Sequence, residues 1–240
     1  MCTVTIFYKG EEDFVLTSNR DEAPNRISLN PDLYNINDSE LLFPKDKQSD
    51  GTWIGASSNN RSICLLNGGF EIHKRELEYR KSRGLVVKEF LLMKNIEDAL
   101  DYDYTNIEPF TIVIVDWGVG LKFCEIVWDG NKAYFKKLPL TNHIWSSSTL
   151  YNKEKKQIRN NWFEDFKTEN KLTSKSLMEF HKTAGKGNDD FGVVMDRGFV
   201  KTTSITQIEK TKDVVEMRFH NLNTNESLVK SLNLAQTINE

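Results

Sequence analysis

The chain has 240 residues, enough to bury a sizeable hydrophobic core in one large or two small domains. Hydrophobic residues make up 38% and charged residues 28%, a balance typical of soluble globular proteins. The 32 basic and 35 acidic residues give a net charge of −3, which argues against a nucleic-acid-binding surface.

No stretch of the sequence has the length and apolar character of a membrane span, and acidic residues at positions 11–13 interrupt any secretory signal. The odd cysteine count, with Cys2, Cys64 and Cys124 far apart, does not suggest a disulfide framework. The four histidines lack the paired spacing of a metal site, so we expect no metal and no cofactor. These features predict a reduced, cytoplasmic protein.

The first part of the chain has the alternating pattern of β-strands. Residues 2–8 and 14–19 alternate in polarity and predict an antiparallel hairpin around a charged turn. The segment from 20 to 50 is polar and contains three prolines, which predicts a long functional loop. Residues 52–57 and 61–67 predict a second hairpin.

The rest of the chain alternates between helical and strand-like segments. Apolar residues recur every three or four positions over 82–102, which predicts a helix with Ser82 as its N-cap. Further helices are predicted over 151–169 and 174–185. Further strands are predicted over 110–117, 121–130, 133–140, 191–198, 199–209, 213–221 and 227–234. Because the strands come as hairpins, we expect antiparallel sheets with helices on their faces, in a single α+β domain of residues 1–240.

The first hairpin brings chemically useful groups together. If its two strands pair, Asn19, Arg20 and Asp21 return close to Cys2 at the start of the chain. The carboxylate can hold an α-ammonium group, and the guanidinium can lower the pKa of a thiol. The same spacing also fits a solvated turn beside a buried strand cysteine.

The second hairpin and the first predicted helix add three candidates. Asn67 offers a side-chain amide that could donate to an oxyanion, and the two glycines after it permit close backbone approach. Trp53 suits a pocket wall or simple packing. Arg83 lies in the first turn of the predicted helix, where a cation gains nothing from the helix dipole, and this favours a role in binding a ligand.

The motifs MCT, SNRDE, GTWIG, LLNGG and SRG occur in this order over the first third of the chain. Together they resemble the NRDE-domain family, also called the transport-and-Golgi-organisation (Tango) type. The chain is also distantly similar to the cysteine amidases that act on bile salts and penicillin V. This resemblance implies an N-terminal-nucleophile (Ntn) hydrolase-like fold, a four-layer αββα sandwich of two antiparallel sheets.

The resemblance also implies an activity: after removal of the initiator methionine, the exposed cysteine attacks an amide or thioester carbonyl, with its own α-amine as the base. It makes Cys2 the nucleophile, Asp21 the orienting carboxylate and Asn67 an oxyanion donor. The expected ligand is a small acyl or lipid-like molecule. Candidate substrate-binding residues are Asn19, Arg20, Trp53, Arg83 and Ser147.

Two departures from the amidases favour an alternative. Where those enzymes carry an arginine three residues before the aspartate, this chain has Ser18, and Ser147 or Ser148 stands in the place of an active-site asparagine. Loss of one oxyanion donor costs about 3 kcal/mol of transition-state stabilisation. The alternative is a non-enzymatic cytosolic ligand-binding or carrier protein that uses the same cleft. Its ligand would be a lipid, an acyl-CoA or haem, which are linked to members of the family.

Overall fold

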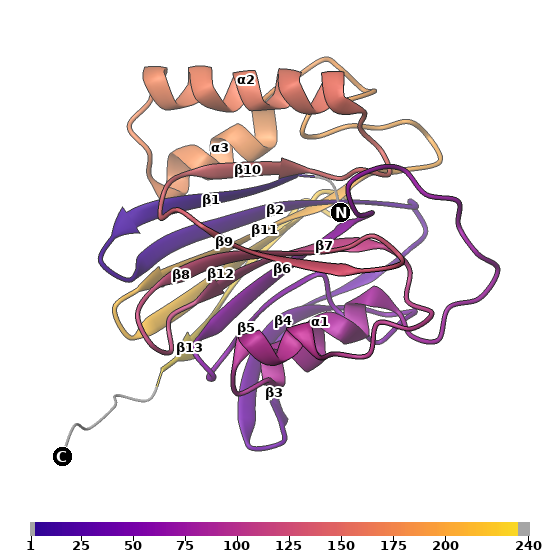
Figure 1. The fold of residues 1–240 in the computed structure, drawn as a ribbon. Coiled ribbons are helices and arrows are strands. Elements are labelled where there is room, and N and C mark those ends of the chain that lie inside the picture. The colour runs from indigo at the N-terminus through magenta and orange to yellow at the C-terminus, as the bar shows by residue number, and fades with distance from the viewer. Residues whose placement is uncertain (1–2, 235–240) are drawn as a thin grey trace.

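The computed structural model describes residues 3–234, and in it two antiparallel sheets lie face to face between outer layers of helices (Figure 1). Helices α2 (Lys153–Glu169) and α3 (Ser174–Thr183) cover one sheet. Helix α1 (Arg83–Leu92) and the 3₁₀ helix η1 (Ile96–Leu100) lie on the other sheet. The predicted α+β fold of four αββα layers is confirmed.

Each sheet is built from neighbouring hairpins joined by a few longer connections. The first sheet has the order β10-β1-β2-β11-β12-β13 and the second the order β3-β4-β5-β6-β7-β8-β9. The strands of the first sheet are β1 (Thr3–Gly10), β2 (Asp13–Glu22), β10 (His143–Ser146), β11 (Lys201–Thr211), β12 (Val214–Asn221) and β13 (Glu226–Asn233). The strands of the second are β3 (Ser28–Ile36), β4 (Ser39–Asp46), β5 (Ile54–Ser57), β6 (Arg61–Asn67), β7 (Phe110–Asp116), β8 (Lys122–Trp128) and β9 (Ala133–Leu138).

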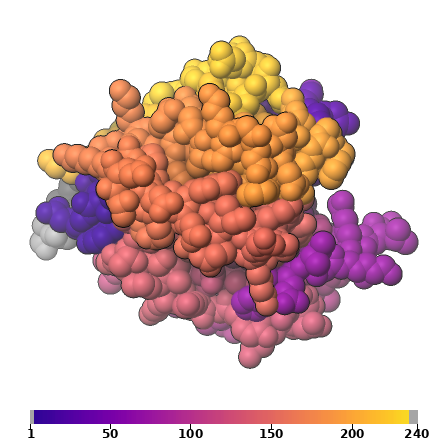
Figure 2. Space-filling model, turned by 90° about the horizontal axis from the view of Figure 1, so that it is seen from above, coloured from indigo at the N-terminus to yellow at the C-terminus, as the bar shows by residue number. Residues whose placement is uncertain are grey.

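The largest core lies between the two sheets, and the alternation of β1 shows how it forms. Val4 and Ile6 are fully buried in this core. Thr3 and Thr5 point to the other face, where they bond to side chains of α2 and α3. A strand has side chains on both faces, so β1 contributes to the inner core and to the helical layer. Viewed from the helical side, α2 and α3 cover much of the first sheet, and the segment between β6 and α1 projects at one edge (Figure 2).

The predicted loop over 20–50 is wrong, because it contains most of the hairpin formed by β3 and β4. Asn37 and Asp38 form its turn and both have positive φ, as the tight turns that suit twisted hairpins require. Pro31 lies in β3 at the edge of the sheet, where the register shifts between Leu29 and Asp32. Proline is tolerated at such an edge because no neighbouring strand needs its missing N–H.

The predicted helix over 82–102 is interrupted. Ser82 does cap α1, accepting a hydrogen bond from the Leu85 N–H, but the helix ends at Leu92. The Arg61 guanidinium donates to the carbonyls of Phe90 (2.9 Å) and Met93 (2.7 Å), which would otherwise lack partners at the helix end. A side chain from β6 therefore ends a helix that local periodicity would extend.

The segment 191–198 forms turns that return the chain from α3 to β11, and the predicted strand there is wrong. The Gly192 N–H donates to the Asn188 carbonyl (2.8 Å), and Gly198 has a φ of +79°. The apolar residues that suggested a strand instead fill a core, as Val193 is buried beneath α3. No helix among residues 3–234 is long and apolar enough to cross a bilayer.

Candidate active site

The start of β1 lies between β10 and β2 in the first sheet. Thr3 pairs with Asn19 of β2 on one side and with Ser146 of β10 on the other. Cys2, the predicted nucleophile, precedes Thr3 in the chain and lies outside the described residues. The site is therefore built from the side chains around this strand end.

Asp21 is buried on the helical side of β2. Its carboxylate accepts hydrogen bonds from the Tyr151 hydroxyl (3.0 Å) and the Thr202 hydroxyl (2.6 Å). Tyr151 comes just before α2 and Thr202 lies opposite Asp21 on β11, so three separate segments meet at this carboxylate. Two directed donors hold the carboxylate in one orientation, as a group that orients reactive atoms requires.

Asn19 lies on the same side of β2, against α3 rather than in a cavity. Its side-chain amide donates to the carbonyls of His181 and Val193, both at 2.9 Å, and its carbonyl oxygen contacts the His181 Nδ1. The other ring nitrogen of His181 lies 2.8 Å from the Thr5 hydroxyl. Burial and the nearby charge of Arg159 lower the pKa of His181 to about 3, so this histidine is neutral at physiological pH.

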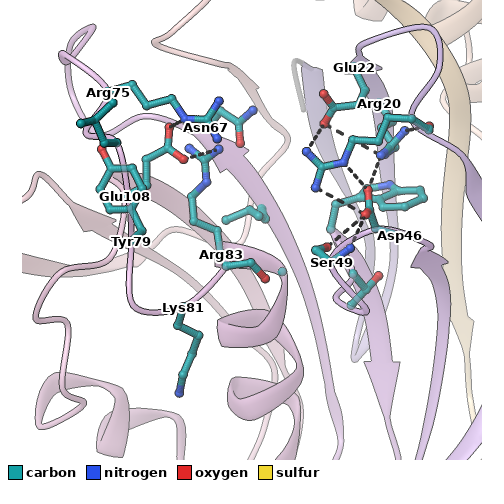
Figure 3. Close-up of a pocket in the computed structure, with 17 residues that line it drawn as sticks. Arg20, Glu22, Asp46, Ser49, Asn67, Arg75, Tyr79, Lys81, Arg83 and Glu108 are labelled. Carbon is teal, nitrogen blue, oxygen red and sulfur yellow. Dashed lines mark hydrogen bonds and ion pairs between the residues drawn. The ribbon is translucent and has the colours of Figure 1, made fainter.

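Arg20 points to the opposite side of β2, into a cavity of about 290 Å³ between the two sheets and α1 (Figure 3). Its guanidinium bonds to Asp46 (2.6 Å) and lies 4.6 Å from the centre of the Trp53 ring. Asp46 also accepts from Arg26 (2.8 Å), and Glu22 lies 3.5 Å from the same arginine. One wall of the cavity is thus a dense cluster of charges.

A second charged cluster forms the facing wall. Arg83 bonds to Glu108 (3.1 Å) and donates to the Pro109 carbonyl (3.2 Å), and Arg75 lies 3.8 Å from Glu108. Figure 3 shows Asn67 on this side, opposite Arg20 and Asp46. Sequence reasoning selected Arg20, Trp53, Asn67 and Arg83, and all four line this one cavity.

The cavity wall carries more positive than negative charge. Its lining includes the cations Arg20, Arg26, Arg75, Lys81 and Arg83 and the anions Glu22, Asp46 and Glu108. Burial lowers the pKa of Arg20 and Arg83, against the pull of nearby carboxylates, yet guanidinium groups stay charged in proteins. An excess of cationic side chains around the cavity suits a ligand with an anionic group.

Two glycines bring the walls of this cavity together. Thr52, next to Gly51 in the β4–β5 loop, donates from its backbone N–H to the Gly84 carbonyl in α1 (3.1 Å). A Cβ placed on Gly51 would lie 2.6 Å from the Gly84 carbonyl carbon. The glycines of the GTWIG and SRG motifs therefore allow a close approach of loop and helix that a larger residue would prevent.

Ser18 and Ser147, which depart from the amidase pattern, are both buried. The Ser147 hydroxyl donates to the Asn67 backbone carbonyl (2.8 Å) and lies 3.0 Å from the Thr149 hydroxyl. Ser18 makes a weak contact with the Asn19 carbonyl (3.4 Å). Ser147 therefore ties the end of β6 to the segment before α2 and is not among the residues that line the charged cavity.

No motif or pattern in the sequence indicated several of the residues that form the site. Tyr151 and Thr202 hold Asp21 although they are 130 and 181 positions away. Asp46 lay in a segment predicted as loop, and Glu108 precedes a strand without any motif. These residues could be assigned to the site only if the pairing of the strands were already known.

A comparison with models of protein families assigns the chain to a family. Residues 1–226 match the family model described as Transport and Golgi organisation 2. The chain belongs to this family. No curated protein sequence matches this family member significantly.

Solved structures share its fold. An N-acylethanolamine-hydrolyzing acid amidase ortholog from Caenorhabditis elegans superposes with a TM-score of 0.59 at 14% identity, covering 86% of this chain and 92% of the amidase. A variant of the conjugated bile acid hydrolase from Clostridium perfringens gives 0.51 at 10% identity, covering 100% and 99%. Penicillin V acylase from Agrobacterium tumefaciens gives 0.52 at 10% identity, covering 98% and 87%. At these identities the likeness shows the fold alone, which is that of the Ntn hydrolases.

Proposed function

We propose that this family member is an acyl hydrolase or transferase that uses Cys2, freed by removal of Met1, to attack a small amide or thioester. The observation that carries the proposal is the buried Asp21 carboxylate, held by Tyr151 and Thr202 on the strand beside the start of β1. The Cα atoms of consecutive residues are about 3.8 Å apart, so Cys2 cannot be far from Thr3.

In the proposed reaction the α-amine of Cys2 takes the proton from its own thiol, since a free α-amine has a pKa of about 8. The thiolate attacks the substrate carbonyl carbon, and the Asn67 side-chain amide donates to the oxyanion that forms. The α-ammonium then returns the proton to the leaving amine or thiol as its bond to the carbonyl carbon breaks. Water cleaves the resulting acyl-thioester, releasing the carboxylic acid and restoring the thiol.

The charged cavity supports a substrate with an anionic group. Arg20 and Arg83 lie on facing walls of this cavity, and each guanidinium group is paired with a carboxylate, Arg20 with Asp46 and Arg83 with Glu108. The volume of about 290 Å³ is at the lower end for ligand pockets, so the cavity suits a small polar group rather than a long chain.

A pair of thioesters with the same acyl group tests the proposal. The protein is incubated with S-acetylglutathione, which is anionic, and with neutral S-acetyl-N-acetylcysteamine, and the adduct is located by mass spectrometry. We expect acetylation at Cys2 that hydroxylamine removes, faster with the anionic donor, and no turnover in Cys2→Ala. No Cys2 adduct together with equal turnover in Cys2→Ala would refute the enzymatic proposal.

Arg83→Gln tests the anion site separately, with Arg80→Gln as a control, because Arg80 lies outside the cavity lining. We expect Arg83→Gln to slow reaction with the anionic donor at least tenfold and to leave the neutral donor unchanged. Equal slowing of both donors would show that Arg83 does not recognise the anionic group.

A carrier without catalysis is the second candidate, and the position of Ser147 favours it. Its hydroxyl is bonded to the Asn67 carbonyl, so at the place of the amidase asparagine the chain presents no amide donor. Such a carrier would hold the anionic part of a lipid or acyl-CoA in the charged cavity, and no histidine is among the described residues that line it to ligate haem iron. Calorimetric binding of S-acetylglutathione that is equal in wild type and Cys2→Ala, without turnover, would support the carrier.

We also propose a cytoplasmic location. Cys64 and Cys124 are free thiols in the described part of the chain, and both are buried. Burial raises the pKa of Cys64 to about 12 and that of Cys124 to about 11, so both stay protonated and unreactive. Selective thiol chemistry at Cys2 is compatible with such a background.

A further inference from the structure

A second cavity lies between the segment that follows β6 and the start of α2. Its volume is about 410 Å³, within the range of small-molecule pockets, and residues 70–72 and 148–153 belong to its walls. Figure 2 shows these two segments side by side. A smaller cavity of about 140 Å³ adjoins it, since the two share Phe70, Ser148 and Lys156. Neither shares a lining residue with the charged cavity, so they form a separate candidate site.

Lys156 of α2 is half-buried at the boundary of these two cavities. Its ammonium group donates to the Ser148 hydroxyl (2.7 Å), which in turn donates to the Gly69 carbonyl (2.6 Å). Glu125 lines the smaller cavity but accepts from the Trp145 indole N–H (2.6 Å) and forms no ion pair with Lys156. An ammonium group has three hydrogens to donate, and within residues 3–234 a side chain accepts one of them. Lys156 can therefore bind an anionic partner from the cavity.

The start of α2 carries several cations around the larger cavity. Lys153, Lys155 and Lys156 all line it, and Glu71 is the one anion among the described lining residues. Lys155 is paired with Asp190, and Lys153 lies 4.0 Å from Glu71, so Lys156 is the lysine of this group without a carboxylate partner in the described chain. Burial lowers the pKa of Lys156, and a helix dipole disfavours cations near its N-terminus. A bound anion would offset both effects.

Apolar side chains form the remaining walls. Phe70 and Ile72 are large hydrophobic residues, yet 55% and 75% of their surfaces are exposed. Phe70 lines both cavities and lies edge-on to the Tyr134 ring, with the ring centres 5.1 Å apart. The smaller cavity has further apolar lining from Leu66, Val127 and Trp145. A ligand with an apolar body would remove this surface from water, which is favourable.

We propose that the two cavities form one binding site for a small amphiphilic carboxylate, whose charged group bonds to Lys156 and whose apolar body packs against Phe70. A carboxylate fits better than a phosphate because Glu71 and Glu125 also lie on the walls, and they repel a dianion more strongly than a monoanion. This site goes beyond the proposed function, since it uses neither Cys2 nor the charged cavity.

Three probes separate the two parts of the proposed recognition, with binding measured by calorimetry. Octanoate carries both the charge and the apolar tail, octanamide carries the tail alone, and acetate carries the charge alone. A hydrogen bond between charged groups should make octanoate bind at least tenfold more tightly than octanamide. Octanoate that binds no more tightly than octanamide would overturn the inference.

Variants of α2 test the role of Lys156 itself. Lys156→Gln should weaken octanoate binding at least tenfold and leave the weak binding of octanamide unchanged, whereas Lys156→Arg, which keeps the charge, should retain most of the affinity. Lys167→Gln is the matched control, because Lys167 lies in the last turn of the same helix, outside both cavities. Octanoate affinity that is equal in Lys156→Gln and Lys167→Gln would overturn the inference.

A measurement on the wild-type protein does not depend on whether the variants fold. Lysine side chains are acetylated with N-hydroxysuccinimidyl acetate, with and without octanoate, and the rate at each lysine is followed by mass spectrometry. Octanoate should slow acetylation of Lys156 and leave the exposed Lys175 of α3 unchanged. If octanoate binds but the rate at Lys156 does not change, the ligand lies elsewhere and the inference is wrong.

Discussion

The charged cavity depends on Asp46, and replacing it by asparagine gives a direct test of that dependence. The Asp46 carboxylate accepts from Arg20 (2.6 Å), from Arg26 (2.8 Å) and from the Ser49 N–H (2.9 Å). Asparagine keeps the shape but removes the charge, leaving Arg20, with only 3% of its side chain exposed, without its closest carboxylate. Removing one partner of a buried ion pair costs about 3–5 kcal/mol. Because the amide oxygen can still accept a hydrogen bond, we expect a loss of about 3 kcal/mol.

Urea unfolding at pH 7, followed by tryptophan fluorescence, measures this loss. Asp50→Asn is a matched control, since Asp50 pairs with Lys45 but 66% of its side chain is exposed. An exposed ion pair contributes at most about 1 kcal/mol, so the control should remain close to wild type. If Asp46→Asn lost no more stability than Asp50→Asn, the reasoning about the buried cluster would be refuted.

The stability difference between wild type and Asp46→Asn should depend on pH. Burial alone would raise the pKa of Asp46, but the Ser49 N–H and the guanidinium groups of Arg26 and Arg20 outweigh burial and hold the pKa below its usual value. Stability that depends on this carboxylate is present above the unfolded pKa of about 3.9 and is lost as pH falls through the lower folded pKa. The difference between wild type and Asp46→Asn should be constant from pH 7 to about pH 5 and shrink below about pH 4. A difference that stays constant in acid would contradict the assignment.

Three further substitutions probe the fold around the site. Gly51→Ala should lower the free energy of unfolding, measured in urea, by about 1–3 kcal/mol, because its Cβ would lie 2.6 Å from the Gly84 backbone. Gly118→Ala is the control and should be tolerated, since the nearest contact of its Cβ would be at 3.7 Å. Equal stability of the two variants would refute the close packing of Gly51 against Gly84. Between about pH 6.5 and 3, His181 is protonated in the unfolded state but not in the folded state, so the free energy of unfolding falls by about 1.4 kcal/mol for each pH unit of acidification. His181→Gln should lack this dependence on pH. An unchanged dependence in the variant would exclude a buried neutral histidine. Phe163→Ala should cost about 3–5 kcal/mol in thermal or urea unfolding because Phe163 is fully buried between α2 and the first sheet, and a loss under 1 kcal/mol would contradict that packing.

Local sequence patterns correctly predicted those structural features that depend only on residues a few positions apart. Alternation predicted the hairpin of β1 and β2. The Ser82 cap and the start of α1 follow from the same kind of short-range information. Side-chain direction and helix capping depend on immediate neighbours, so they can be inferred without the fold.

Other elements were mispredicted because distant contacts outweighed local preference. The prolines in the segment 20–50 suggested a loop, but Pro31 occupies an edge strand that tolerates it. The periodicity over 82–102 suggested one helix, but the Arg61 guanidinium satisfies the carbonyls at an earlier end. In both cases a neighbouring strand decided how the segment folds.

The sequence by itself determined the antiparallel hairpins, the helix starts and the motif order that resembles the family. Only the tertiary structure decided which charges share a site. Arg20 and Arg83 face one cavity because β2 and α1 are brought together across the sheets, and Asp21 is held by Tyr151 from 130 residues away. Strand alternation depends only on neighbouring residues and can be recognised in the sequence. The pairing of distant strands depends on burial of the whole core, and this pairing places Thr202 of β11 beside Asp21 of β2.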